Sequence, residues 1–287
     1  MIRFLSALAL IALVSPVAAQ DAAQRREWNA PAAPFRIIGN VYYVGTAGLS
    51  AFLIVDPAGS VLIDGGLPES APRIEANIRR LGFRMRDIRY ILNNHSHADH
   101  AGGLAALQRA SGARLVASRG DRADLIAGRT VDRPELGAFP PVLPQQTIGD
   151  GGTIRVGRTV LTAHLTPGHT SGATSWSLRT SQAGKPIDVL FLSSLSVAGR
   201  KLVTGRPPRD TAAVAQFRST FRKLATLRAD VVLSYHAEQF DLVAKREALK
   251  AGDLLAFVDR GELARRTEEF ARAFATELAK QRRATQS

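Results

Sequence analysis

The chain of 287 residues contains no cysteine, so it can form neither disulfides nor cysteine-ligated metal sites, and a cysteine-linked lipid anchor is not expected. Aromatic residues make up only 6% of the chain and form no apparent stacking platform. Although the net charge is +13, the Lys and Arg residues are dispersed, which argues against a nucleic-acid-binding function. Neither Ser-x-x-Lys nor Gly-x-Ser-x-Gly occurs, so a nucleophilic serine has no supporting context.

An apolar run lies at the N-terminus, over residues 4–14, directly after Arg3. Small residues follow it up to Ala19, which is the pattern of a secretory signal peptide. The run has about half of the roughly 20 residues that a membrane-spanning helix needs. We expect residues 1–19 to be a signal peptide and residues 20–287 to be a protein of the bacterial periplasm, without membrane attachment after cleavage. An uncleaved anchor is the alternative.

Five of the six histidines fall in three short segments, and the first segment is the richest. It reads His95-Ser96-His97-Ala98-Asp99-His100. Three imidazoles and a carboxylate this close are costly to desolvate without a partner, whereas zinc accepts neutral imidazole nitrogen and carboxylate oxygen. Residues two apart can point the same way, but the adjacent Asp99 and His100 are expected to diverge, which suggests two metals. Surface histidines in a polar loop are the alternative interpretation.

The other two segments each present one histidine after a strand-like run. In residues 166–172 a proline and two glycines predict a tight turn that carries His169. The hydrophobic residues 231–233 lead to His236. Either histidine alone has a structural role as its simplest explanation, but together with the first segment both become candidate ligands. His164 is left over and is interpreted as a strand residue or a neighbour of a ligand.

The order of elements along the chain predicts the architecture. Residues 35–64 are predicted to form three or four short strands, and residues 69–81 a helix. The metal motif, a helix and a strand follow, and then roughly the same order recurs. This predicts an α/β protein built as a four-layer αββα sandwich in one domain. Residues 118–146 are predicted to be irregular, either lining a substrate groove or forming a surface excursion.

The chain resembles the metallo-β-lactamase-fold hydrolases, and within them the class B β-lactamases of subclass B3. The resemblance extends from about Trp28 to the C-terminal helix. Its motifs are Asn40-Val41-Tyr42-Tyr43-Val44-Gly45-Thr46, Leu62-Ile63-Asp64-Gly65-Gly66-Leu67-Pro68-Glu69-Ser70, the six-residue metal motif, Gly168-His169-Thr170 and Ser193-Ser194-Leu195-Ser196. The chain departs from the subclass at positions that are not ligands, namely Ser96, Ala98 and Ser193, and these departures bear on substrate range and efficiency and not on metal binding.

The resemblance implies two zinc ions per chain and hydrolysis of the β-lactam amide bond by a metal-bound hydroxide. The substrates would be penicillins, cephalosporins and carbapenems, and the outcome antibiotic resistance. Asp99 would be the catalytic residue that orients the nucleophile, and Ser194 and Ser196 would bind the substrate carboxylate. The implied metal ligands are His95, His97 and His169 for the first zinc, and Asp99, His100 and His236 for the second.

The main alternative is another exported dizinc hydrolase of the same superfamily, a lactonase or a thioesterase. Such enzymes use a metal-bridging Asp at the end of a strand, which here is the strand 189–192. Ser193 and Ser194 follow it, and Asp188 lies too early. A non-catalytic zinc-binding protein is the non-enzyme alternative. Asp64 is interpreted as structural, bonded to backbone or to a ligand histidine. The sequence does not specify the preferred β-lactam class or the oligomeric state, for which a monomer is the default.

Overall fold

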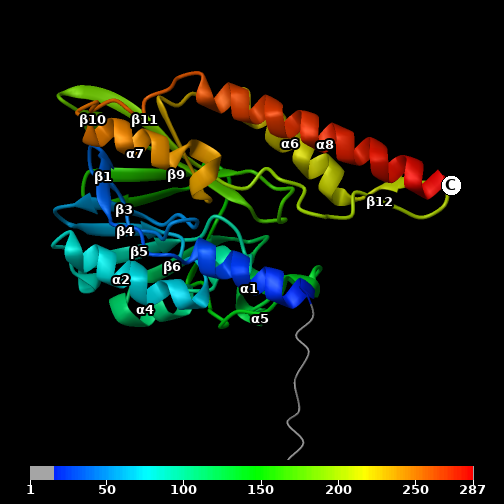
Figure 1. Ribbon diagram of the computed structural model, residues 1–287, viewed down its shortest axis with the longest axis horizontal. Helices are drawn as coiled ribbons and strands as arrows, with labels where there is room; N and C mark the ends of the chain where they lie inside the picture. The colour runs from blue at the N-terminus through cyan, green and yellow to red at the C-terminus, as the bar shows by residue number, and fades with distance from the viewer. Residues whose placement is uncertain (1–15, 287) are drawn as a thin grey trace, which may run out of the picture.

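The computed structural model of the chain describes residues 16–286. Residues 1–15, which make up most of the predicted signal peptide, lie outside the described residues. Two mixed β-sheets face each other, and helices cover the outer face of each sheet (Figure 1). The predicted four-layer αββα sandwich is therefore confirmed.

The first sheet has seven strands in the order β1-β2-β3-β4-β5-β6-β7. The pairs from β1 to β4 are antiparallel and those from β4 to β7 are parallel. The strands are Phe35–Ile38, Val41–Tyr43, Phe52–Asp56, Gly59–Ile63, Ile88–Leu92, Arg114–Ser118 and Gln146–Ile148. The prediction of strands between residues 35 and 64 is confirmed by β1 to β4, where branched and aromatic residues suit a pleated, half-buried surface.

The second sheet has five strands in the order β14-β11-β10-β9-β8. The pairs from β8 to β11 are antiparallel, whereas β11 and β14 are parallel. The strands are Thr153–Val156 (β8), Thr159–Leu165 (β9), Thr174–Gln182 (β10), Lys185–Leu192 (β11) and Val231–Ser234 (β14). A separate two-stranded ribbon pairs β12 (Val203–Thr204) with β13 (Arg209–Asp210).

Helices α1 to α5 lie on the side of the first sheet, and α6 to α8 lie on the side of the second (Figure 1). They are α1 Pro16–Trp28, α2 Ala71–Arg80, α3 Ala98–Ala101, α4 Leu104–Ser111, α5 Arg122–Ala127, α6 Ala212–Leu224, α7 Leu242–Lys250 and α8 Glu262–Gln286. The helix predicted over residues 69–81 is confirmed by α2, which the short 3₁₀ turn Pro68–Ser70 precedes. The sequence does not predict α1 beyond residue 19, or α5.

The main core lies between the two sheets. Tyr43, Phe52, Trp176, Phe191 and Phe240 pack there, each at most 3% exposed. Two further apolar clusters fill the space between the sheets and the helices, and another joins α6, α8 and β12. Because Trp176 is fully buried, truncating it to alanine would cost about 3–5 kcal/mol. This packing gives rigid strands from which the loops at one edge extend.

Four strands end at that edge. β9, β11 and β14 run in the same direction, so their carboxyl ends meet, and β5 of the first sheet ends beside them. Backbone hydrogen bonds join the sheets here, from the nitrogen of Ser50 to the carbonyl of Tyr235 (3.0 Å) and from Ala237 to Gly48 (3.1 Å). The carboxyl ends of strands are where α/β proteins usually place their sites.

The helix predicted after the metal motif is divided in two. α3 contains Asp99 and His100, and α4 begins only after Gly102 and Gly103. A Cβ on Gly103 would collide with the backbone carbonyl of Gly65, and one on Gly102 with Pro68. Glycine is therefore required where the segment after β4 passes close to the metal motif.

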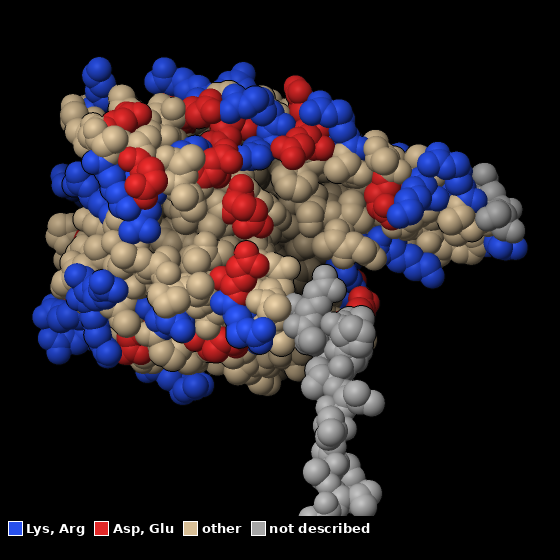
Figure 2. All heavy atoms as spheres, in the orientation of Figure 1, with Lys and Arg blue, Asp and Glu red and all other residues tan. Residues whose placement is uncertain are grey.

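Lys and Arg side chains are spread over the face shown in Figure 2, interspersed with Asp and Glu. Many form exposed pairs, such as Arg179 with Asp188 (2.7 Å). Such pairs contribute roughly 0–1 kcal/mol each, so the high net charge is not a source of stability. None of the helices in the described part of the chain combines the length and the apolar character that a bilayer crossing requires.

Candidate metal centre

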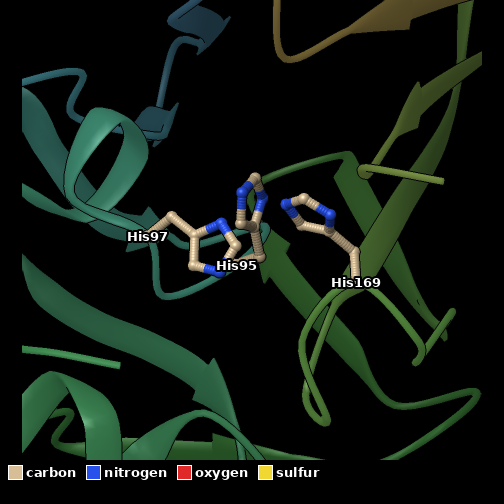
Figure 3. A group of neighbouring side chains, drawn as sticks. All are labelled: His95, His97 and His169. Atoms are coloured by element: carbon tan, nitrogen blue, oxygen red, sulfur yellow. The ribbon is translucent and has the colours of Figure 1, made fainter. Parts of the chain in front are cut away.

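Three histidines from two loops converge at the shared edge of the sheets. His95 and His97 lie between β5 and α3, and His169 lies between β9 and β10. Their ring centroids are 4.5–4.9 Å apart, and one nitrogen from each ring lies within 4.8 Å of the others. Figure 3 shows the three rings gathered around one point. We call these residues the three-histidine group.

Hydrogen bonds fix the orientation of these rings. The Nδ1 of His169 donates to the carbonyl of Ser196 (2.7 Å), and the Nδ1 of His95 contacts the Oδ1 of Asn94. Donation by Nδ1 leaves the lone pair on Nε2, the atom that a metal can accept. The Nε2 of His97 is buried without a hydrogen-bond partner among the described residues. Such an atom costs about 1–3 kcal/mol, and a bound cation would remove that cost.

Burial also sets the charge of the three-histidine group. It lowers the pKa of His95 and His169 well below the usual value, and that of His97 to about 4. All three imidazoles are therefore neutral near pH 7, which is the form that ligates metals. Neutral donors that converge in a buried place fit a zinc ion.

A second convergence centres on Asp99. Its Oδ2 lies 3.1 Å from the Nε2 of His100 and 3.1 Å from the Nε2 of His236. Donor atoms of Asp99, His100 and His95 also lie within 4.8 Å of one another, so this place adjoins the first. We call Asp99, His100 and His236 the Asp99 group. The expectation that Asp99 and His100 diverge is wrong, because both side chains of the one-turn helix α3 face the same point.

His100 lies between two carboxylates. Its Nε2 faces Asp99, and its Nδ1 is 3.6 Å from the Oδ2 of Asp64. Burial alone would lower the pKa of His100, but the two carboxylates raise it to about 9. Asp64 also accepts the backbone N–H of Asn94 (2.9 Å), which confirms the prediction that it bonds backbone or a ligand histidine. A cation bound to the Asp99 group would displace the proton of His100.

A cavity of about 610 Å³ opens over both groups. Its walls come from α1, from the segment Glu135–Gly137, from Ser196 and Ala198, and from the turn after β14. The ring of Trp28 lies edge-on to that of His236, with centroids 4.9 Å apart. The alternative in which residues 118–146 line a groove therefore holds for their central part, Glu135–Gly137. The cavity has the size of a small-molecule site.

The two serines predicted to bind substrate occupy different places. Ser196 lies in the cavity wall. Ser194 is 1% exposed, and its hydroxyl donates to the phenolic oxygen of Tyr235 (2.8 Å) while accepting the backbone N–H of Ser196 at 3.4 Å.

His164 is a residue of β9, and its Nε2 bonds the hydroxyl of Ser177 at 2.8 Å. Tyr235, which the sequence did not single out, also lines the cavity.

Two arginines that no motif marks join the cavity loops to each other. Arg200 donates to the carbonyl of His169 (3.3 Å) and to the carboxylate of Asp132 (2.9 Å). Arg133 donates in the opposite direction, to the carbonyl of Ala198 (2.6 Å). An isolated arginine in a loop carries no sequence signal for such a role, because both partners come from other loops.

Comparison with known proteins agrees with this geometry. The family model described as the metallo-beta-lactamase superfamily matches residues 45–236, a span that contains all six candidate ligands. The chain belongs to the metallo-β-lactamase superfamily. This family uses metal ions, which agrees with the two groups of converging donors.

Solved structures of superfamily members are similar over nearly their whole length. BJP-1, a subclass B3 metallo-β-lactamase of Bradyrhizobium japonicum, is 37% identical with a TM-score of 0.83, covering 90% of this chain and 98% of that one. The Rm3 metallo-β-lactamase is 40% identical with a TM-score of 0.81, covering 92% of this chain and 98% of that one. The resemblance to subclass B3 is confirmed.

A Cronobacter sakazakii metallo-β-lactamase described by its HARLDQ motif is 38% identical, with a TM-score of 0.84 over 90% of this chain and 99% of that one. The corresponding residues here are His95-Ser96-His97-Ala98-Asp99-His100. Histidine therefore stands where that motif has arginine and glutamine. The fold accommodates both motifs, so the donor set of this superfamily member follows from its own residues and not from the fold.

Curated relatives point to other substrates. A hydroxyacylglutathione hydrolase of Cereibacter sphaeroides is 28% identical over 183 residues, which are 64% of this chain and 60% of that protein. The mitochondrial persulfide dioxygenase ETHE1 of Homo sapiens is 36% identical over 122 residues, 42% of this chain and 38% of that protein. The chain thus spans less than two thirds of these relatives, and its substrate must be argued from its own site.

Proposed function

We propose that this superfamily member hydrolyses the amide bond of β-lactams with the help of two zinc ions. The observation that carries the proposal is the donor set: two adjoining groups of donors, with Ser193 and not a carboxylate directly after β11, in a fold similar to subclass B3 enzymes. The three-histidine group would hold one zinc and the Asp99 group the other. When bound, zinc lowers the pKa of a coordinated water and polarises the carbonyl oxygen of the substrate.

The chain's own residues would orient these partners. Asp99 lines the cavity, and although burial alone raises its pKa, His100 and His236 hold that pKa well below the usual value. Its ionised carboxylate is therefore a hydrogen-bond acceptor beside the place where an attacking water would stand. By accepting the Nδ1–H of His169, the carbonyl of Ser196 leaves the Nε2 of that ring free and would orient it for a metal bound to the three-histidine group. These contacts would fix the geometry before substrate enters.

The two serines would contribute to binding of the substrate carboxylate in different ways. Ser196 lies in the cavity wall and would contact the carboxylate directly. The hydroxyl of Ser194 is already engaged with Tyr235, so Ser194 would act by holding Ser196 and Tyr235 in place. Arg25 of α1 also lies in the wall and adds positive charge near an anionic substrate, although it pairs with Glu69.

Hydrolysis of a thioester is the second candidate, favoured by the curated hydroxyacylglutathione hydrolases. In such enzymes the family resemblance implies a metal-bridging carboxylate after the strand that corresponds to β11. Here Ser193 follows β11, is fully buried, and donates its hydroxyl to the carbonyl of Asn94 (3.1 Å). This position supplies no carboxylate to a metal, which supports the β-lactam proposal over the thioester one.

The decisive experiment compares substrates on the purified mature protein, residues 20–287. A carbapenem, a cephalosporin and a glutathione thioester are assayed with zinc, with a chelator, and after zinc is restored. We expect β-lactam turnover that the chelator abolishes and zinc restores, and that Asp99→Ala lowers by at least about 100-fold. Zinc-dependent turnover of the thioester alone would reject the β-lactam assignment in favour of the second candidate.

Export to the periplasm is a further part of the proposal, supported by the N-terminal pattern around residues 4–19. Mass spectrometry of the protein from a periplasmic extract tests it. We expect a mature chain that begins at Gln20 or within a few residues of it. A full-length protein retained with the membrane fraction would contradict this part.

A further inference from the structure

Two carboxylates at the start of α5 lie behind the three-histidine group. Asp121 is 1% exposed and Asp124 is 9% exposed. Asp121 occupies the N-cap position of α5, where an aspartate commonly accepts a backbone N–H of the first turn. It makes no such capping bond here. Its carboxylate is instead directed away from its own helix.

The partners of Asp121 belong to the two loops that carry the three-histidine group. Its Oδ2 accepts the hydroxyl of Thr170 (3.0 Å), and its Oδ1 accepts the backbone N–H of Gly172 (2.8 Å). The backbone N–H of Ser96 also faces this carboxylate and lowers its pKa. Thr170 follows His169, and Ser96 stands between the two histidines of the other loop. One carboxylate thus joins both loops.

Asp124 adds a second attachment to the first of these loops. Its Oδ2 accepts the hydroxyl of Ser96 (2.8 Å), and its Oδ1 accepts the backbone N–H of Val131 (2.9 Å). Ser96 is therefore held through its backbone by Asp121 and through its side chain by Asp124. Because Ser96 is held through both its backbone and its side chain, the flanking His95 and His97 have little freedom to move.

The loop of His169 also packs directly on the turn that precedes α5. A Cβ on Gly172 would collide with the side chains of Ser118 and Asp121, and one on Gly120 would lie 2.6 Å from the carbonyl of Ser171. The hydroxyl of Ser118 donates to the carbonyl of Gly172 (2.6 Å). The contact leaves no room for a side chain at Gly120 or Gly172.

Keeping a carboxylate at this place is unfavourable by itself. Burial raises the pKa of Asp121 to about 7; the hydrogen bond from Thr170 opposes this rise, and the charge of Asp124 adds to it. A residue that only filled space here would be apolar, since burying a carboxylate costs free energy unless donors compensate for it. The donors that do so are all on the two ligand loops.

We propose that Asp121 is a positioning residue that holds the two ligand loops together and thereby sets the metal affinity of the three-histidine group. The inference rests on the proposed metal function. Asp121 makes no hydrogen bond to the Asp99 group in the described structure, and its partners Thr170, Gly172 and Ser96 stand beside ligands of the three-histidine group. Removing its charge while keeping its shape should weaken that site alone.

Zinc binding to chelator-treated protein tests this without any substrate. Competition with a chromogenic chelator measures both zinc affinities for wild type and for Asp121→Asn, and Co²⁺ absorption reports ligand geometry. We expect one affinity to fall by about 10–100-fold and the other to stay within about threefold of wild type. In a His97→Ala background, which disables the three-histidine group, Asp121→Asn should leave the remaining affinity unchanged.

Asp56→Asn is the matched control. Asp56 also joins distant segments by accepting the backbone N–H and the hydroxyl of Thr159 (both 3.1 Å), but at the end of β3 and far along the chain from the ligand loops. We expect wild-type zinc affinities for this control. Equal losses in Asp56→Asn and Asp121→Asn, or two unchanged affinities in Asp121→Asn, would overturn the inference.

If Asp121→Asn does not fold, Thr170→Val takes its place, because it deletes one donor and keeps the carboxylate. It should weaken the same site by roughly 3–10-fold, as loss of one hydrogen bond implies, and unchanged binding would overturn the inference. A wild-type protein that binds no zinc would instead reject the proposed function, so the two failures are distinguishable.

Discussion

Replacing Asp64 should separate its contribution to stability from its contribution to metal binding. Asp64 is 1% exposed and lies at a left-handed backbone position, with φ of 64°. It accepts the backbone N–H of Asn94 (2.9 Å) and contacts the side-chain amide of the same residue. In Asp64→Ala both donors remain buried and lose their acceptor, because the structure around Asn94 is closed.

The expected loss follows from these two donors. Each buried donor without a partner costs about 1–3 kcal/mol, which gives roughly 2–6 kcal/mol for Asp64→Ala. Alanine also tolerates the left-handed backbone less well than aspartate does, which adds to the loss. Asp64→Asn keeps an acceptor for the backbone N–H and tolerates the same backbone conformation, so its loss should be about 2 kcal/mol smaller. It removes the charge that faces His100, so zinc affinity at the Asp99 group should still fall by about 10–100-fold.

Urea unfolding in excess chelator measures the free energy of unfolding, because metal binding then makes no contribution. Zinc titration measures the metal affinity of the same variants. Natural domains of this kind have a free energy of unfolding of about 5–15 kcal/mol, so a loss of this size is well resolved. A loss below about 1 kcal/mol for Asp64→Ala, or a wild-type zinc affinity for Asp64→Asn, would refute the reasoning.

Three further predictions concern the cavity and the metals. Arg200→Ala breaks the contacts to His169 and Asp132 and should raise KM by about 3–10-fold, which steady-state kinetics measures. Urea unfolding should show little change in stability, because the Asp132 carboxylate of this ion pair is 59% exposed and such pairs contribute roughly 0–1 kcal/mol. Ser194→Ala leaves the phenol of Tyr235 without its donor and should raise KM more than it lowers kcat, again by steady-state kinetics. Chelation should lower Tm in calorimetry by roughly 5–10 °C per site occupied at about 100 times Kd, because such occupancy is worth about 2.7 kcal/mol.

The strands were predictable because their signal is local. Between residues 35 and 64, short branched and aromatic runs alternate with turn residues, and β1 to β4 follow that pattern. α1 carries no comparable signal, since it exposes most of its described side chains. Its position depends on distant contacts, such as the pair of Arg25 with Glu69 (2.9 Å) and the bond from the nitrogen of Gly48 to the carbonyl of Trp28 (3.0 Å). No window of the sequence contains both partners.

The candidate ligands could also be predicted from local sequence, whereas the residues that hold them depend on contacts between distant parts of the chain. The donors could be recognised because the motif His95 to His100 concentrates imidazole and carboxylate within six residues. Asp121 could not, because Thr170 lies 49 positions further along the chain. Asp124 could not either, because Ser96 precedes it by 28 positions. An aspartate at the start of a short helix looks like an ordinary cap until the fold shows that it bonds elsewhere.

The comparison with the HARLDQ motif leads to a prediction about what the fold needs. His97→Arg with His100→Gln would bring this chain to the pattern of a structure that it matches with a TM-score of 0.84. The core between the sheets is untouched by these changes, so unfolding should remain cooperative. Zinc binding should fall from two ions to one or none, since each donor group loses a histidine that places its nitrogen at the point of convergence. Calorimetry and zinc titration of the double variant check both parts. A variant that still binds two zinc ions would show that these histidines are not ligands, whereas an unfolded one would show that the metal motif also holds the fold together.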